Sequence, residues 1–361
     1  MFMKNDCKVL IAMSGGVDSS VAALLMKEAG YDCIGVTMKL FSNEEIGLKR
    51  EHTCCSLDDV EDARAVANKL GFPYYVFNFS DRFEEAVIKR FVDAYENGRT
   101  PNPCIDCNRF LKFDALFRRA QELGCEKIAT GHYADITFDE ISGRYLLRKA
   151  KDPSKDQSYV LWSLSQEQLA HTVFPLHDYT KEQARGLAEQ YGLLNARKHD
   201  SQDICFVPDG NYAGFVETYT GKHYPTGEFV TEDGTVLGRH KGIVHYTVGQ
   251  RRGLGLALPE PLYVCRIDVG QNQVVLGKND ALYSKELTAK DVNLIAVPEI
   301  VGKKRLKAKV RYRQKEEWAT VTQTDSDTLH VKFDEPQRAI TKGQSVVLYD
   351  GDVVFGGGII Q

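Results

Sequence analysis

Apolar and polar positions along the first part of the chain follow a repeating order of strands and helices. Residues 7–13 form a short β-branched and apolar run that ends at a glycine turn, which predicts a buried strand. Residues 17–30 carry apolar side chains at helical spacing and end at Gly30, a helix stop signal. The same order continues with predicted strands at 31–41, 73–79 and 127–136 and predicted helices at 56–71, 81–97 and about 109–124.

Strands that alternate with helices indicate an α/β domain with a parallel sheet covered by helices. Ligands of such sheets bind at the carboxyl ends of the strands. The glycine turn after the first predicted strand lies at such an end. We therefore expect a ligand site at this turn.

The pattern changes after about residue 215, where short strand patterns are separated by glycine and proline turns. Such a pattern predicts a small β-rich middle domain followed by a C-terminal β-barrel. A chain of 361 residues is long enough for two or three domains. We expect three, with the boundaries 1–215, 216–285 and 286–361.

Composition narrows the class of protein. Hydrophobic residues make up 43% and charged residues 27% of the chain, as is usual for soluble globular proteins. The N-terminus does not have the pattern of a signal peptide, and no apolar run approaches the roughly 18 residues of a membrane span, so we expect a cytoplasmic protein with no membrane contact. The net charge of −4 argues against a protein that is basic throughout, but it permits a local basic face for RNA.

The stretch AMSGGVDSS after the first predicted strand resembles a phosphate-binding loop, yet it lacks the lysine of a Walker-type loop. Gly15 and Gly16 allow a phosphate to approach the backbone at a helix start, and Ser14 and Ser19 add hydroxyl donors. Asp18 would repel a phosphate unless Mg²⁺ lay between them. The alternative is a capped helix after a tight turn, with Asp18 favourable at the helix N-terminus. The whole string favours phosphate binding.

Two polar loops carry candidate reactive cysteines. Cys104 and Cys107 precede a predicted helix, and a thiol at a helix N-terminus has a lowered pKa. Cys205 lies in a second loop, and nothing in the sequence alone brings the two loops together. By itself the C-x-x-C spacing fits either a redox pair or half of a metal site.

The other cysteines of the nine give weaker signals. Such a large chain is not a disulfide scaffold, so its cysteines are either buried or chemically active. Cys54 and Cys55 adjoin a polar segment and stay unassigned. Four cysteines among apolar neighbours are expected to be inert core residues: Cys7, Cys33, Cys125 and Cys265.

Basic residues alternate with apolar ones in the last part of the chain, from Arg305 to Arg313. On a strand, the basic side chains would share one face with about 6.8 Å between successive charges, at roughly 3.4 Å per residue. Such a ladder suits an RNA backbone. The alternative is a solvated face of the barrel. The basic residues are Arg305, Lys307, Lys309, Arg311 and Arg313.

Seven segments spread over almost the whole chain resemble, in this order, those of the bacterial tRNA-specific 2-thiouridylase family. That family belongs to the ATP pyrophosphatase (PP-loop) superfamily, whose domain is similar to adenine nucleotide α-hydrolases. The segments are AMSGGVDSS, GRTPNPCIDCN, ATGHYA, KDQSYVLW, DSQDICF, HYTVGQRRGLG and YDGDVVFGGGII.

The resemblance implies the reaction and its participants. ATP, with Mg²⁺, would adenylate O2 of the wobble uridine (position 34) of tRNA, and sulfur would then replace this oxygen. Cys205 would carry the sulfur as a persulfide, and Cys107 would attack it and form a disulfide with Cys205. The expected partners are tRNAs for Lys, Glu and Gln and a cysteine desulfurase or sulfur-relay protein. A monomer is expected.

The resemblance also implies binding residues. Met38 and Gly131 would contact adenine and ribose, although Met38 also fits a plain core position and His132 a hydrogen-bonded strand end. The ATP residues would be Ala12, Met13, Ser14, Gly15, Gly16, Val17, Asp18, Ser19, Met38 and Gly131. The tRNA residues would be Asn102, Pro103, Cys104, His132, Lys155, Asp156, Gln157, Arg311, Tyr312 and Gln344.

The chain departs from the family pattern at Cys104, where many relatives have an aspartate that is a candidate base. That role does not transfer to a thiol. Cys104, Cys107 and Cys205 instead form a candidate ligand set for an iron–sulfur cluster with one open iron, an alternative route for the sulfur.

Two rival functions stay open at this point. Another ATP pyrophosphatase, such as an amide-forming ligase, would need no cysteine pair. A non-catalytic RNA- or metal-binding module would leave the AMSGGVDSS loop without a role.

Overall fold

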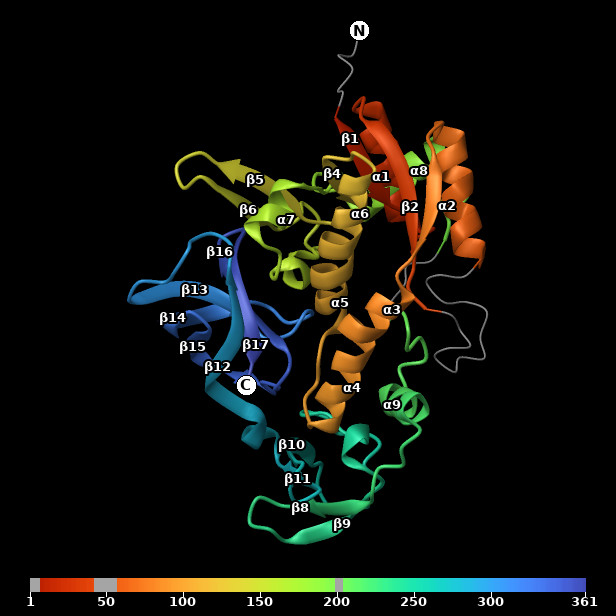
Figure 1. Ribbon diagram of the computed structural model, residues 1–361. Coiled ribbons are helices and arrows are strands. Elements are labelled where there is room, and N and C mark those ends of the chain that lie inside the picture. The colour runs from red at the N-terminus through yellow and green to blue at the C-terminus, as the bar shows by residue number, and fades with distance from the viewer. Residues whose placement is uncertain (1–6, 42–56, 199–203) are drawn as a thin grey trace.

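A computed structural model describes residues 7–41, 57–198 and 204–361. It contains a five-stranded parallel sheet, a four-stranded sheet and an eight-stranded sheet that includes a closed barrel (Figure 1). The predicted fold class, a parallel α/β domain followed by a β-rich middle domain and a barrel, is confirmed. No helix in the described ranges is both long enough and apolar enough to cross a membrane.

The parallel sheet has the strand order β3-β2-β1-β4-β7. Its central strand is buried on both faces, because successive side chains of a strand point to opposite sides. Val9 and Ile11 pack towards α1, α2 and α8, whereas Leu10 packs towards α6. The strands are β1 (Lys8–Ala12), β2 (Asp32–Lys39), β3 (Tyr74–Asn78), β4 (Lys127–Thr130) and β7 (Thr172–Val173). The three helices on the first face are α1 (Val17–Glu28), α2 (Leu57–Leu70) and α8 (Lys181–Gln190).

Two long helical segments follow β3, and both contain π-helical turns, η1 and η2. The second segment begins at Pro103, earlier than the predicted start near residue 109. The Asn102 side chain caps it by accepting a hydrogen bond from the Cys104 N–H at 3.2 Å, and proline is tolerated at the first helical position. The segments are α3 (Ser80–Phe83), η1 (Glu84–Ile88) and α4 (Lys89–Glu96), then α5 (Pro103–Asp106), η2 (Cys107–Ala115) and α6 (Leu116–Glu122).

The single strand predicted for residues 127–136 is wrong, because the chain leaves the sheet after β4. Residues 135–148 instead form the antiparallel hairpin of β5 (Asp135–Asp139) and β6 (Arg144–Arg148). β6 pairs with a barrel strand at Val353 opposite Arg148, so the hairpin joins the first domain to the barrel sheet. The short helices η3 (Ser158–Leu161) and α7 (Gln166–Ala170) follow.

The middle sheet has the order β10-β11-β8-β9. It is preceded by α9 (Tyr212–Thr220), which begins at the side-chain cap Asn211. Its elements are β8 (Gly227–Val230), β9 (Val236–His240), η4 (Ile243–His245), β10 (Tyr263–Asp268), β11 (Gln273–Gly277) and η5 (Asn279–Leu282).

The C-terminal sheet closes into a barrel because β12 pairs with both β15 and β17. The predicted boundary between residues 285 and 286 falls within β12. The strands are β12 (Tyr283–Leu294), β13 (Lys303–Lys309), β14 (Glu317–Asp325), β15 (Thr328–Arg338), β16 (Ser345–Asp350) and β17 (Val353–Ile360).

The predicted ladder of five cations along one strand is wrong in length. β13 ends at Lys309, so of the five predicted cations it carries Arg305, Lys307 and Lys309. Arg311 and Arg313 lie in the turn before β14. The alternation of basic and apolar residues continues past the end of the strand, and for this reason periodicity alone placed the strand end too late.

Candidate active site

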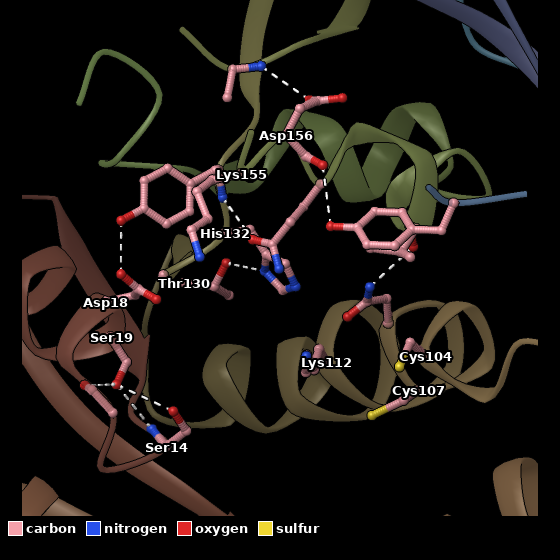
Figure 2. Close-up of a pocket in the computed structure, with 18 of the residues that line it drawn as sticks. Ser14, Asp18, Ser19, Cys104, Cys107, Lys112, Thr130, His132, Lys155 and Asp156 are labelled. Atoms are coloured by element: carbon pink, nitrogen blue, oxygen red, sulfur yellow. Dashed lines mark hydrogen bonds between the residues drawn. The ribbon is translucent and has the colours of Figure 1, made fainter. Parts of the chain in front are cut away.

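A cleft of about 2170 Å³ opens at the carboxyl edge of the parallel sheet, where β1, β2 and β4 end side by side. Helices α5 and η2 and the turn after β13 line it as well. Figure 2 shows Ser14, Asp18 and Ser19 on one side of the site and Cys104 and Cys107 on the other. The cleft therefore brings together the loop after β1 and both cysteine loops, because Cys205 also lines it.

The loop after β1 is held in shape by its own hydroxyl groups. Ser19 Oγ accepts a hydrogen bond from the Ser14 N–H at 3.2 Å and donates to the Gly16 carbonyl at 3.0 Å. Asn195, from the segment after α8, donates to the Gly15 carbonyl at 3.0 Å. Gly15 has a φ of 74° and lies against α2, where a Cβ would come within 2.4 Å of the Asp59 carbonyl oxygen. The loop is thus fixed before any ligand binds.

A lysine distant in sequence supplies the positive charge that the loop sequence lacks. Lys181 Nζ, at the start of α8, lies 2.8 and 2.7 Å from the two carboxylate oxygens of Asp18. Tyr133 also donates a hydrogen bond from its hydroxyl group to Asp18 Oδ1 at 2.7 Å. Asp18 is 31% exposed in its side chain, whereas Lys181 is 10% exposed. A buried cation and a tyrosine therefore position the carboxylate beside the loop.

The three cysteines of the site differ in burial. Cys104 is exposed, Cys107 is buried and Cys205 is half-buried. Cys107 and Cys205 pack in the same apolar cluster, although no disulfide joins them to each other. The two loops that the sequence left apart thus meet at one wall of the cleft.

The prediction of a lowered thiol pKa at the helix N-terminus is wrong for Cys107. Burial raises its pKa, and the opposing charge of Lys112 lowers it less. Here the free-energy cost of removing water from the thiolate is larger than the stabilisation that the helix N-terminus gives to it. Cys107 is accordingly a neutral thiol at pH 7.

We expect alkylation of Cys107 in the folded protein to have a pH midpoint above the usual thiol value of about 8.5, because only the thiolate reacts. Iodoacetamide labelling from pH 7 to 10.5, read by tandem mass spectrometry of the peptide that contains Cys107, measures it. Protein unfolded in urea provides the control and should return to the ordinary midpoint. A midpoint below 8.5 in the folded protein would contradict the burial argument.

The segment of residues 155–157 connects the barrel to the sheet. The Asp156 backbone carbonyl accepts a hydrogen bond from the Tyr312 hydroxyl at 3.2 Å. Gln157 Oε1 accepts from the Tyr133 N–H at 2.9 Å, and the Gln157 N–H donates to the Tyr133 carbonyl at 2.8 Å. Since Tyr133 also holds Asp18, hydrogen bonds connect this segment to the loop after β1. Lys155, Asp156, Gln157 and Tyr312 all line the cleft.

His132 lies in the middle of the site (Figure 2). Its Nδ1 is 2.7 Å from Thr130 Oγ1, and its ring packs beside Phe113 and Phe174. Burial, with a smaller effect of Lys112, holds the pKa of His132 well below the usual value. The imidazole is therefore neutral at pH 7. The sequence also allowed His132 to be a hydrogen-bonded residue at a strand end, and its hydrogen bond to Thr130 at the end of β4 agrees with this.

Comparison with known proteins gives full-length relatives. The tRNA-specific 2-thiouridylase MnmA of Clostridioides difficile is 52% identical over 361 residues, which cover 100% of this chain and 99% of the relative. The chain belongs to the tRNA-specific 2-thiouridylase family. The enzyme of the same name from Acetivibrio thermocellus is 54% identical over 356 residues, covering 98% of this chain and 99% of the relative.

Family models divide this 2-thiouridylase family member into three parts. A tRNA methyl transferase HUP domain matches residues 7–209, a tRNA methyl transferase PRC-barrel domain residues 213–278, and an aminomethyltransferase β-barrel domain residues 284–360. Among solved structures, a 4-thiouridine synthetase–RNA complex with bound ATP covers 59% of this chain and 53% of its own, with 19% identity and a TM-score of 0.37. This last likeness is too small to carry an argument.

Most of the residues that the 2-thiouridylase resemblance selects line the cleft, but three do not. Gly15 belongs to the loop but lies against α2. Arg311 Nη2 donates to the carbonyls of Val248 and Ala339 at 3.1 Å each, and Gln344 Nε2 donates to the Thr100 carbonyl at 2.8 Å. Arg311 and Gln344 thus brace the domains against one another, and their contact with tRNA stays a prediction. The selected residues that line the cleft are Ala12, Met13, Ser14, Gly16, Val17, Asp18, Ser19, Met38, Asn102, Pro103, Cys104, Cys107, Gly131, His132, Lys155, Asp156, Gln157, Cys205 and Tyr312.

The candidate iron–sulfur ligands do not converge. Within residues 7–41, 57–198 and 204–361, no group of three or more His, Cys, Asp or Glu side chains is arranged to hold a metal ion. Cys104, Cys107 and Cys205 line the same cleft without forming such a group. Cys54 and Cys55 lie outside the described residues.

Sequence reasoning missed several residues of the site. Lys181 and Asn195 reach the loop from more than 160 residues away, and no local motif marks either of them. Lys112 lines the cleft between the loop and the cysteines (Figure 2). A signal existed only for Tyr133, which lies inside the ATGHYA segment.

Proposed function

We propose that this chain uses ATP to adenylate O2 of the wobble uridine (position 34) of tRNA and then replaces that oxygen with sulfur from a persulfide on Cys205. Membership of the 2-thiouridylase family makes the chain a tRNA sulfurtransferase. The observation that carries the proposal is the single cleft lined by the loop after β1, by Cys107 and Cys205, and by the segment 155–157. A site for adenylation and a site for sulfur transfer thus share one space.

Adenylation would take place at the loop after β1, which is the PP-loop of the superfamily. Its fixed backbone and the N-terminus of α1 suit a leaving pyrophosphate. Met38 and Gly131, at the ends of β2 and β4, would flank the adenosine. The target base must leave its stack to reach the cleft, and Asn102, Pro103 and Cys104 at the start of α5 would receive it.

Sulfur transfer would use the persulfide of Cys205. Its terminal sulfur attacks C2 of the adenylated uracil, the C2–O2 bond breaks, and AMP leaves with the electron pair. The Cys107 thiolate attacks Cys205 Sγ and breaks its bond to the transferred sulfur, which stays on C2 as the thiocarbonyl. The two cysteines are thereby oxidised to a disulfide, which a thiol reductant must reduce before the next turnover.

The buried state of Cys107 places a condition on this step. The attack requires a thiolate, yet burial raises the pKa of Cys107. Displacement of the apolar side chains around Cys107, as tRNA or the persulfide loop engages, would remove this cost. The proposal therefore ties activation of Cys107 to substrate binding.

The proposal includes Mg²⁺, with Asp18 as its carboxylate ligand. Mg²⁺ in nucleotide sites takes one or two carboxylates together with substrate phosphates, and Asp18 is a single, partly exposed carboxylate beside the phosphate loop. The residues present thus fit the ion, with Lys181 moving from Asp18 to the phosphates. Bound there, Mg²⁺ would neutralise charge on the pyrophosphate.

The iron–sulfur alternative has no support from the arrangement of the three cysteines, and we derive no step from it. The partners in the proposal are tRNAs for Lys, Glu and Gln and a cysteine desulfurase or relay protein that delivers the sulfur in the cytoplasm. Arg305, Lys307 and Lys309 of β13 face the same side as exposed Trp318 and would extend the tRNA contact.

Iron-free protein given ATP, Mg²⁺, a persulfide donor and tRNA is expected to form 2-thiouridine at position 34, detected by nucleoside mass spectrometry. A tRNA with cytidine at position 34 serves as the control and should stay unmodified. ATP-dependent AMP formation that needs an amine instead of a sulfur donor would support the ligase alternative. Failure to bind ATP would support a non-catalytic module, and activity that appears only with iron would support the cluster.

A further inference from the structure

Lys112 is a charged residue of the cleft that neither the sequence analysis nor the proposed reaction uses. Its side chain is half-buried and lines the cleft. Among the residues that the structure describes, none forms a hydrogen bond or ion pair with its ammonium group. Removing part of the water around an ammonium group without a compensating partner is costly, so such a residue in a cleft suggests an anionic ligand.

The π-helical turn explains why Lys112 faces the cysteines. Cys107 and Lys112 are five residues apart within η2. In an α-helix, side chains five apart diverge by about 140°, because 3.6 residues make a turn. A π-helix instead closes its hydrogen bonds between residues five apart, which stacks them on successive turns, and such turns occur often at functional sites. The irregular helix thus places the cation on the side of the reactive thiol.

Lys112, Cys107 and His132 line the same cleft. The positive charge of Lys112 lowers the pKa of both Cys107 and His132. Figure 2 shows Lys112 and His132 between the PP-loop residues and the two cysteines. In the proposed reaction, the α-phosphate attached to O2 and the persulfide sulfur that attacks C2 must come together in this part of the cleft.

We propose that Lys112 binds the α-phosphate of the adenylated uridine and stabilises AMP as it leaves. When the sulfur attacks C2, the C2–O2 bond breaks and its electron pair passes to the phosphate, which gains negative charge. A fixed ammonium group then interacts more strongly with the transition state than with the adenylated substrate. Lys112 would therefore act as a catalytic residue of the second half-reaction, an inference that rests on the proposed function.

The test separates the two half-reactions in Lys112→Gln. Adenylation is followed as tRNA-dependent pyrophosphate release and as label from α-³²P-ATP on tRNA, and thiolation is followed as 2-thiouridine. We expect thiolation to fall about a hundredfold, the usual effect of losing one such stabilising group. Pyrophosphate release should stay within threefold of the unmodified chain, and ³²P-labelled tRNA should accumulate. Lys112→Arg, which keeps the charge, should recover at least a tenth of the thiolation.

Lys89→Gln is the matched control, because Lys89 lies on α4, is 61% exposed and pairs with Glu84 outside the cleft. It should leave both rates unchanged. Thiolation at the full rate in Lys112→Gln, or an equal fall of both half-reactions, would overturn the inference. So would recovery of thiolation by Lys112→Gln at pH 9.5, since the ammonium group would then act on the Cys107 thiolate. If the unmodified chain releases pyrophosphate but makes no 2-thiouridine, the proposed function fails and this inference fails with it.

Discussion

Cys205→Ser and Cys107→Ser are each expected to reduce 2-thiouridine formation by at least about 10³-fold, the scale of losing a nucleophile. A serine at residue 205 cannot carry a persulfide, and a serine at residue 107 cannot take the sulfur of Cys205 into a disulfide. Adenylation should survive in both variants, because the PP-loop lies on the other side of the cleft. Pyrophosphate release and nucleoside mass spectrometry on the same samples measure the two effects.

Cys7→Ser is the appropriate control for this pair. Cys7 is half-buried at the start of β1 and does not line the cleft. The Cys7→Ser variant should thiolate tRNA at the rate of the chain without substitutions. Thiolation by Cys107→Ser above a tenth of that rate would exclude the disulfide step, whereas loss of pyrophosphate release in either variant would show that the thiol contributes to adenylation.

The contact between the two cysteine loops gives this prediction its physical basis. Thiol–disulfide exchange requires the sulfurs to meet, and the sequence alone left the loops unrelated. Cys107 and Cys205 enter one apolar cluster with Phe206 and Leu111, so they belong to the same wall of the site.

The regions that the sequence predicted well are those with local signals. The β1–loop–α1 unit follows from an apolar run, two glycines and helical spacing, all within residues 7–30. The change to short β patterns after residue 215 likewise marks the middle sheet and the barrel. Errors arose where local signals were ambiguous, as at Gly131, where the chain leaves the sheet although the pattern of residues 127–136 continues.

The charges of the site could not be predicted in the same way. Asp18 appeared as a lone anion next to phosphates, and its partner Lys181 lies 163 residues away on α8. The pKa of Cys107 was predicted from its helix position, but the burial that decides it comes from the packing of distant segments. Lys112 was not selected from the sequence, because no local signal shows that the helix holding Cys107 and Lys112 is π-helical.

Gly131→Ala is expected to abolish ATP-dependent pyrophosphate release. A Cβ at residue 131 would lie 2.7 Å from the Ser19 backbone nitrogen and 2.8 Å from the Asp18 carbonyl carbon. Both contacts are with backbone at the start of α1, so no side-chain rotation relieves them. The PP-loop and α1 must shift away from β4, which breaks the Tyr133–Asp18 hydrogen bond and moves the phosphate site. Isothermal titration with a non-hydrolysable ATP analogue should show at least a tenfold loss of affinity.

Gly186→Ala is the matched control, because it adds the same methyl group within α8. No heavy atom lies within 4 Å of that Cβ, and alanine in a helix is more favourable than glycine by roughly 0.5–1 kcal/mol. Gly186→Ala should therefore melt at an equal or higher temperature and bind the analogue normally, while Gly131→Ala should melt lower. Normal binding by Gly131→Ala would mean that β4 and α1 separate readily. The closeness of Gly131 to the PP-loop would then be incidental, and its place in the ATP site would rest on the resemblance alone.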